Sequence, residues 1–350
     1  MSTPRIEVEK GFTISRIIKG GWQLSQGHSE GNTGTALTDM QAFVDAGITT
    51  FDCADIYTGV EELIGKFLKD YRARHGQRAP VEIFTKFVPD YDALSTLTKA
   101  DVERVIDRSL RRLGVDQLDM VQFSWWNYAM PRWMDTIRWL SELQKAGKIR
   151  HLGGTNFNTA AVQAMTTSGV RLATLQVQFS VLDHRPEKEL IAFCQANRVH
   201  LVCYGTVAGG FLSERWLGQP EPLPPFENRS LVKYKLMIDE FGGWNLFQQL
   251  LLVLKSIADK HRVSITNIAT RYVLEKPMVA AAIVGARSAQ HLDENRKVFA
   301  FQLDAQDQHA IAQVLNQRTG PAGDVFDLER IKDGPHGRIM RYNLNQQATD

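Results

Sequence analysis

Residues 51–57 read FDCADIY, and this stretch joins the end of a short apolar run to the start of a helical pattern. The run ends in the acid Asp52, and Tyr57 follows five residues later. A second apolar run, residues 81–84, leads to Lys86. An ammonium near a tyrosine favours the phenolate and lowers its pKa, while a carboxylate keeps that ammonium charged and oriented. Each residue alone is typical of a helix cap, a packed ring or a surface charge, but together at strand ends they predict a proton-donating phenol.

Short β-rich runs alternate with amphipathic helical patterns along the chain. Repeated β-α units require a parallel sheet, and eight of them favour a closed (β/α)8 TIM barrel with its active site at the C-terminal strand ends. The alternative is an open doubly wound sheet, but no expected strand opens onto the G-x-G-x-x-G turn of that fold. The eight expected strands are Ile17–Trp22, Ile48–Asp52, Val81–Lys86, Leu118–Ser124, Ile149–Gly154, Thr174–Phe179, His200–Tyr204 and Ala281–Val284.

The whole chain of 350 residues is predicted to form one domain, with the barrel over about residues 12–303 and an extra helix and tail after it. Residues 205–243 are rich in proline and are expected to form a long irregular loop after the seventh strand, a kind of loop that is usually functional. An extra helix is expected over residues 305–315, and tail residues 338–343 are expected to fold back over the barrel mouth. Other helical patterns with start and stop signals cover residues 98–114, 133–147 and 158–165.

Composition excludes several classes of protein. Hydrophobic residues make up 43% of the chain, charged residues 23%, and the formal net charge is +2, which is ordinary for a soluble globular protein. There is no long basic block for nucleic acid or a membrane surface, and no apolar run is long enough to span a bilayer. The first ten residues lack the apolar core of a signal peptide, and three scattered cysteines show no metal or redox spacing. These features predict a cytoplasmic protein without a metal, and they leave a homo-oligomer open.

At this point the chain resembles the aldo-keto reductase superfamily from Gly20 to about Leu303. The resemblance implies an NADP(H)-dependent oxidoreductase that transfers hydride between nicotinamide and a carbonyl or alcohol carbon of an aldehyde, ketone or sugar. Tyr57 would then be the general acid and base, assisted by Lys86 and Asp52. The matching pieces are residues 51–57 with Glu62 and Gly65, Phe84-Thr85-Lys86, Gly153-Gly154-Thr155-Asn156-Phe157, Leu175-Gln176-Val177, Tyr204 and residues 285–295.

The resemblance also implies which residues hold the cofactor. Thr155, Asn156 and Gln176 would bind the nicotinamide carboxamide, and Tyr204 would stack on the ring. Residues 209–212 and 224–231 are similar to the branch that includes the voltage-gated potassium-channel β subunits, in which this loop lies over the cofactor pyrophosphate. Further expected cofactor residues are Gly21, Trp22, Asp52, Gly205, Thr206, Val207, Gly209, Arg215, Arg229, Gly285, Arg287, His291, Glu294 and Asn295.

The last motif, residues 285–295, also has a physical reading, whose alternative is a serine-capped surface helix with ordinary polar residues. A Gly-Ala turn precedes a helical pattern whose first turn carries Arg287 and Ser288, and a helix N-terminus with an arginine is an anion site. An arginine there suits a 2′-phosphate and therefore favours NADP(H) over NAD(H). For Arg215 and Arg229 the alternative is that they are solvated loop charges.

One position departs from the family pattern. The family has a histidine at the end of the fourth strand, where this chain has Ser124. Losing an oriented donor at the reacting oxygen typically costs on the order of 10²–10³ in rate. Three explanations stay open: Ser124 is the natural residue and the enzyme uses Tyr57 alone, a neighbour such as Tyr128, Trp125 or His28 fills the gap, or the chain is an engineered inactive variant.

The same departure leaves a second function open. The channel β subunits also lack this histidine, so the chain could be an NADP(H)-sensing regulatory binding subunit with weak or no turnover. Trp22, Tyr57, Trp125, Trp126 and Tyr128 are predicted to line an aromatic substrate pocket that suits apolar carbonyls or sugar rings. Packing of the aromatic residues beyond Tyr57 against the tail is the alternative.

Overall fold

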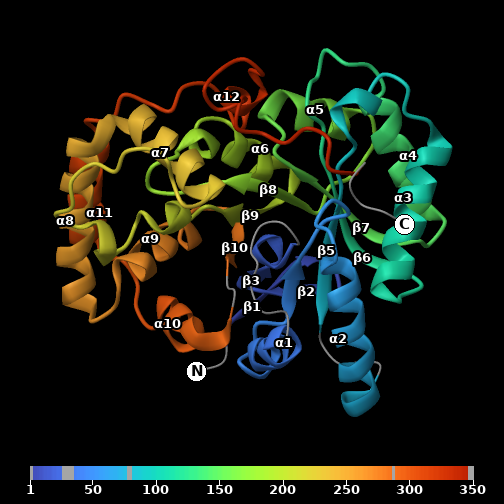
Figure 1. The fold of residues 1–350 in the computed structure, drawn as a ribbon, viewed down its shortest axis with the longest axis horizontal. Coiled ribbons are helices and arrows are strands. Elements are labelled where there is room, and N and C mark those ends of the chain that lie inside the picture. The colour runs from blue at the N-terminus through green and yellow to red at the C-terminus, as the bar shows by residue number, and fades with distance from the viewer. Residues whose placement is uncertain (1–2, 26–34, 77–80, 286–287, 346–350) are drawn as a thin grey trace.

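The computed structural model describes residues 3–25, 35–76, 81–285 and 288–345. Eight parallel strands form a closed barrel, which confirms the (β/α)8 fold and excludes the open sheet (Figure 1). All eight expected strands are present, although β3 ends at Gly20 because residues 22–24 form a 3-10 turn. The barrel strands are β3 (Ile17–Gly20), β4 (Thr50–Asp52), β5 (Glu82–Phe87), β6 (Leu118–Phe123), β7 (Ile149–Thr155), β8 (Thr174–Gln178), β9 (His200–Tyr204) and β10 (Val279–Gly285).

Amphipathic helices surround the barrel and bury their apolar stripes against it (Figure 1). In α3 the predicted capping pair is present, since Thr98 and Asp101 cap each other and Gly114 ends the helix with φ 64°. The helices are α1 (Ala36–Asp45), α2 (Val60–His75), α3 (Lys99–Leu113), α4 (Trp133–Lys145), α5 (Thr159–Thr167), α6 (Leu190–Asn197), α7 (Arg229–Phe241), α8 (Gly243–His261), α9 (Ile265–Leu274), α10 (Leu292–Arg296), α11 (Ala305–Leu315) and α12 (Asp327–Arg330).

An antiparallel hairpin that the sequence analysis missed closes the N-terminal end of the barrel. It consists of β1 (Arg5–Glu9) and β2 (Phe12–Ser15), joined through Gly11 at φ 74°. Its inward side chains, including Phe12, pack with barrel residues such as Phe84 in an apolar cluster of their own. The hairpin therefore plugs one end, and the C-terminal strand ends at the other remain for a site.

The sequence analysis expected the long segment after β9 to be irregular throughout, but part of it is helical. Residues 229–241 form helix α7, which begins where the Asn228 side chain accepts a hydrogen bond from the Leu231 N–H at 3.1 Å. The prolines within residues 220–225 made the helix hard to predict from the sequence, because they lie just before its cap. The cap, rather than the prolines, sets where the helix begins.

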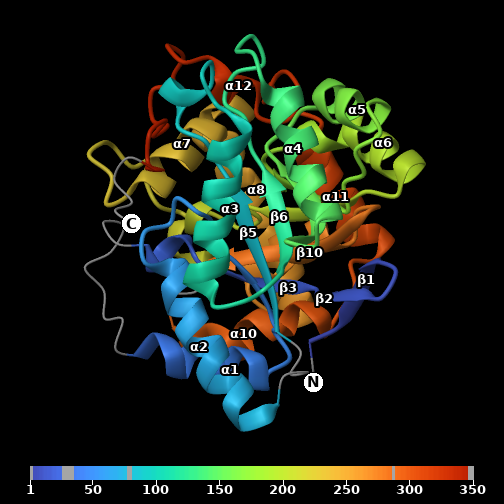
Figure 2. The same ribbon diagram turned by 90° about the vertical axis from the view of Figure 1, so that its right-hand side faces the viewer.

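The C-terminal tail lies over the barrel mouth, as predicted. The Tyr91 N–H, in the loop after β5, donates to Tyr342 O at 2.9 Å, and the Tyr342 ring packs edge-on against Trp126. Helix α12 lies at the top of the molecule, far from the β1–β2 hairpin (Figure 2). The tail therefore joins loops that are separated from it by about 200 residues or more of sequence.

A buried ion network fastens this tail. The Arg185 guanidinium bonds both oxygens of Asp183, at 2.9 and 2.7 Å, and both oxygens of Glu329, at 2.9 and 3.1 Å. All three residues are at most 1% exposed. A charge buried this deeply is tolerated only when it is paired and hydrogen-bonded, so the network depends on each of its members.

The network predicts a specific loss of stability in acid. Burial raises the pKa of Glu329, but Arg185 outweighs that effect and lowers it to about 2. Because the unfolded carboxyl titrates at about 4.3, stability from this group is present above that value and is lost as the pH falls toward 2. We therefore expect the gap in unfolding free energy between wild type and Glu329→Gln to narrow from about pH 6 to about pH 3. Urea unfolding between these pH values measures the difference in unfolding free energy, and Glu227→Gln, at an exposed position, is the control. A difference that stays constant with pH would contradict the prediction.

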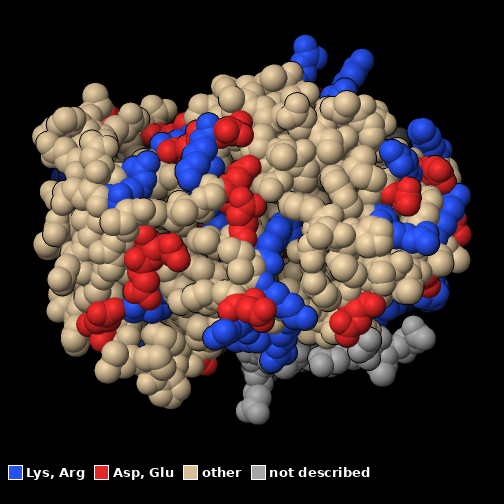
Figure 3. Space-filling view, turned by 90° about the horizontal axis from the view of Figure 1, so that it is seen from above, with Lys and Arg blue, Asp and Glu red and all other residues tan. Residues whose placement is uncertain are grey.

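The surface fits the charge balance of the sequence. On the face that carries α12, seen from above, Lys and Arg side chains lie among Asp and Glu side chains (Figure 3). Within the described ranges, no helix has both the length and the apolar content needed to cross a membrane.

Candidate active site

The acid and the lysine predicted from sequence meet at the C-terminal ends of neighbouring strands. Asp52 ends β4, and its Oδ2 lies 2.6 Å from Lys86 Nζ on β5. Lys86 also donates to Cys53 O at 2.8 Å. Burial by itself lowers the pKa of Lys86, but Asp52 outweighs it, so the pKa lies above its usual range. Lys86 thus provides a buried, charged ammonium, which Asp52 and the Cys53 carbonyl hold in one orientation.

Tyr57 lies beside this ammonium. Lys86 Nζ is 5.1 Å from the centroid of the half-buried Tyr57 ring. The Trp22 ring packs against the Tyr57 ring, with 5.0 Å between the two centroids. Burial raises the pKa of Tyr57, and Lys86 opposes this without reversing it. The net direction is opposite to the lowering predicted from sequence, because desolvation of the phenolate exceeds the attraction of the ammonium. The phenol therefore holds its proton at neutral pH, as a proton donor must.

Gln122 is a member of this cluster that the sequence analysis missed. It lies on β6, fully buried, and its Nε2 donates to Asp52 Oδ1 at 3.0 Å. Gln176 on β8 donates to the same oxygen at 2.7 Å and to Gln122 Oε1 at 3.2 Å. The signal in the sequence was a polar residue between the apolar Val121 and Phe123 near the end of the strand. Asp52 is thus a carboxylate satisfied from three strands.

The residues predicted to hold the carboxamide lie next to this cluster. Both amide hydrogens of Gln176 serve Asp52 and Gln122, which leaves its Oε1 to accept from a ligand. Asn156, after β7, accepts from the Tyr204 hydroxyl at 2.8 Å through its Oδ1, so its Nδ2 is left to donate. Thr155 is buried beside Gln176 in the β7–β8 register. One acceptor and one donor are what a primary amide requires.

Tyr204 has a cation close to its ring that the sequence analysis did not identify. Lys233 on α7 lies 3.5 Å from the Tyr204 hydroxyl and 5.0 Å from the ring centroid. Burial lowers the pKa of Lys233 and raises that of Tyr204. The side chain of Lys233 therefore supports the ring that is predicted to stack on nicotinamide.

Ser124 lies directly after β6, is 7% exposed, and its N–H donates to Phe87 O at 3.0 Å. Among the described residues its hydroxyl has no hydrogen-bond partner. Of the neighbours considered as replacements for the family histidine, Tyr128 is bound by Arg330 and His28 lies outside the described residues. Ser124 can thus offer a free hydroxyl where the histidine would stand.

The aromatic residues predicted to line a substrate pocket differ in their surroundings. Trp22 and Tyr57 pack together at the mouth, and Trp126 is half-buried with its Nε1 donating to Pro89 O at 2.8 Å. Trp125 does not line a pocket, because its ring is 1% exposed and packs on Phe123 in the core. The predicted alternative, packing against the tail, applies to Trp126 and Tyr128.

The loop residues predicted for the pyrophosphate have protein partners. Gly205 and Gly209 have positive φ and pack against the Tyr234 ring, where a Cβ would collide. The hydroxyl of Thr206 is buried against Thr270 at 3.2 Å. Arg215 is 65% exposed and lies 3.4 Å from Glu227. The half-buried residues are Val207 and Arg229, the second of which begins α7.

The adenosine segment differs from its prediction. Arg287 lies outside the described residues. In place of a regular helix, a 3-10 turn, Ala289–His291, leads into the short α10. The Ala289 N–H donates to Asp39 Oδ1 on α1 at 3.0 Å, so a carboxylate takes a backbone N–H that was predicted to face an anion. The physical reason is tertiary, since the packing of α1 brings Asp39 to this turn.

Several other residues predicted to bind the cofactor already contact other parts of the protein. Glu294 accepts from Asn267 at 2.7 Å and pairs with Lys297 at 2.7 Å, so its carboxylate already has protein partners. Gly285 packs against the Gln23 side chain, and Gly21 donates to Asp52 O at 2.7 Å where no Cβ would fit. His291 is exposed and Asn295 half-buried.

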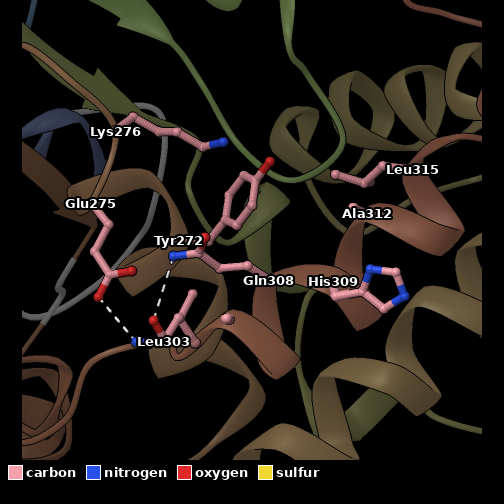
Figure 4. Close-up of a pocket in the computed structure, with 9 residues that line it drawn as sticks. Tyr272, Glu275, Lys276, Leu303, Gln308, His309, Ala312 and Leu315 are labelled. Atoms are coloured by element: carbon pink, nitrogen blue, oxygen red, sulfur yellow. Dashed lines mark hydrogen bonds between the residues drawn. The ribbon is translucent and has the colours of Figure 1, made fainter.

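A cavity of about 520 Å³ lies elsewhere, between α9 and α11. Its lining includes Tyr272, Lys276 and His309, and Glu275 and Gln308 both hydrogen-bond Leu303 at its edge (Figure 4). Glu275 and Lys276 precede β10, so the cavity belongs to the end of the barrel opposite the site.

The sequence of this chain matches the family model of the aldo/keto reductases over residues 16–316. The chain belongs to the aldo/keto reductase family. It is 26% identical to the aldo-keto reductase YhdN of Bacillus subtilis, over 91% of this chain and 95% of that protein. Its fold is similar to the glycerol dehydrogenase of Gluconobacter oxydans, with 22% identity, 93% and 97% of the two chains covered, and a TM-score of 0.74. It is also similar to an aldo-keto reductase of Bombyx mori solved with NADP, with 20% identity, 96% and 99% coverage, and a TM-score of 0.70.

Proposed function

We propose that this aldo/keto reductase is an NADP(H)-dependent oxidoreductase that interconverts a small carbonyl compound and its alcohol. The observation that carries the proposal is the buried Lys86–Asp52 pair next to the Tyr57 ring, at the C-terminal strand ends of a closed barrel. The structure of the Bombyx mori relative with NADP supports the choice of cofactor. A cytoplasmic location and a small-molecule partner stay predictions from the sequence.

Each residue has a role in this proposal. The cofactor, when bound, supplies or accepts the hydride. Tyr57 holds a proton at its Oη and gives it to the developing alkoxide, while Lys86 stabilises the phenolate that remains. Asp52 keeps Lys86 charged, and Gln122 keeps Asp52 oriented. Gln176 Oε1 and Asn156 Nδ2 fit the two groups of a primary amide such as the nicotinamide carboxamide, and Tyr204 supplies a flat ring.

The test uses the purified protein without substitutions. We expect NADPH to quench its tryptophan fluorescence, because Trp22 lies beside Tyr57. We also expect NADPH oxidation with at least one of a panel of aliphatic, aromatic and sugar aldehydes and ketones, with NADH as the cofactor control. Absence of both quenching and turnover would contradict the proposal.

A second candidate function is a regulatory subunit that binds NADP(H) with weak or no turnover. The observation that favours it is Ser124, whose neutral hydroxyl replaces the family's imidazole but has neither its reach nor its charge. The Tyr57→Phe variant separates the two functions. If the biological activity of the chain survives that change with the cofactor still bound, binding is the function.

A further inference from the structure

Arg330, the last residue of α12, reaches from the C-terminal tail into the loops at the barrel mouth. Its Nη1 donates to the backbone oxygens of Trp125 and Trp126, at 2.5 and 3.0 Å. Its Nη2 donates to the Tyr128 hydroxyl at 2.7 Å and to Asn156 O at 2.5 Å. One guanidinium thus joins the loop after β6 to the turn after β7.

The bonding of this guanidinium is unusual for its charge. Among the residues that the structure describes, Arg330 forms no ion pair, and all four of its acceptors are uncharged. The guanidinium also lies 4.0 Å from the centroid of the Tyr128 ring, which is favourable for a cation. The four bonds therefore depend on the planar set of N–H donors of an arginine, which a lysine does not have.

Asn156 is the residue in this cluster that bears on the cofactor. Its backbone has φ 62°, in the left-handed region that few residues other than glycine adopt and that asparagine adopts more readily than most. Hydrogen bonds from the surroundings help to hold this conformation. Here the Asn156 N–H donates to Gln176 O at 2.9 Å, its Oδ1 accepts from Tyr204, and its O accepts from Arg330. The third of these bonds is the one that comes from outside the barrel.

The neighbour of Arg330 fixes the arginine in place. Glu329 is bound by both terminal nitrogens of Arg185, and the Arg185 side chain is itself buried. The tail is thus anchored one residue before the guanidinium. This anchoring limits the entropy that Arg330 would lose in making its four bonds.

We propose that Arg330 is a positioning residue of the cofactor site, which acts by holding Asn156 in the orientation that presents its Nδ2 to the nicotinamide carboxamide. The proposal rests on the function proposed above and adds a residue and a means of action to it. The tail is then part of the cofactor site as well as a cover for the mouth. A displaced Asn156 would let the nicotinamide ring shift relative to Tyr57, and a shift of about 1 Å can cost about 100-fold in rate.

The experiment compares Arg330→Met and Arg330→Lys with wild type. We expect Arg330→Met to lower kcat/KM by about 10- to 100-fold, to raise KM for NADPH, and to enlarge the isotope effect seen with NADPH deuterated at the transferred position. Arg330→Lys keeps the charge but not the planar fork, so it should recover only part of the loss. Arg338→Met, an exposed arginine of the same tail, is the matched control.

A double-mutant cycle with Asn156→Gly tests the means of action. Glycine tolerates the positive φ and removes the amide, so the fold is kept. If Arg330 acts through Asn156, the losses from the two changes will not add. Additive losses, or an Arg330→Met variant that melts earlier but has wild-type kinetics, would overturn the proposal while leaving the proposed function intact. A wild-type protein that binds no NADPH would overturn both. If Arg330→Met does not fold, Arg330→Lys carries the same cycle.

Discussion

Tyr57→Phe should reduce carbonyl turnover by about 10³-fold, within the range that general acid catalysis contributes. The change removes the phenol hydroxyl beside the Lys86–Asp52 pair and keeps the ring that packs on Trp22. Cofactor affinity should change by less than about twofold, because hydroxyl removal leaves Gln176, Asn156 and Tyr204 untouched. Steady-state kinetics and NADPH fluorescence titration measure the two quantities separately.

The control for this variant is Tyr71→Phe, which makes the same chemical change on α2, where the ring stacks on Phe67 and His75 away from the site. It should keep wild-type turnover. A Tyr57→Phe protein that retains most of its activity would show that another group protonates the product, with the free hydroxyl of Ser124 as the next candidate to remove.

Arg185→Met should lower the free energy of unfolding by about 3–5 kcal/mol, the usual cost of breaking a buried ion pair from one side. The substitution leaves the carboxylates of Asp183 and Glu329 buried, close together and without their shared cation. Urea unfolding followed by circular dichroism measures the change. The effect is large because two like charges then lie in a site with almost no solvent.

Two comparisons make this prediction specific. Arg104→Met removes an ion pair with Asp101 on the exposed face of α3, where the arginine side chain is 69% exposed, and should cost less than about 1 kcal/mol. Combining Arg185→Met with Asp183→Asn and Glu329→Gln removes the unpaired charges and should recover much of the lost stability. A triple variant as unstable as Arg185→Met would show that packing, rather than charge, explains the loss.

The sequence by itself determined the eight strands, the helices with clear caps and the order of Asp52, Tyr57 and Lys86. These features are local, since hydrophobic period, capping pairs and strand-end positions relate residues only a few places apart. The rule that parallel strands place their C-terminal ends on one side then brought the three residues to one rim. Two of the errors were local as well: the β1–β2 hairpin is short, and α7 follows a run of prolines.

Only the tertiary structure decided which side chains meet across the barrel and the tail. Gln122 reaches Asp52 from a strand 70 residues away, Arg330 reaches Asn156 over 174 residues, and Asp39 reaches the Ala289 turn over 250. It also decided that burial raises the pKa of Tyr57 against the pull of Lys86. No spacing in a sequence encodes these contacts, because they depend on how the closed barrel and its tail bring distant segments together and on how much water they exclude.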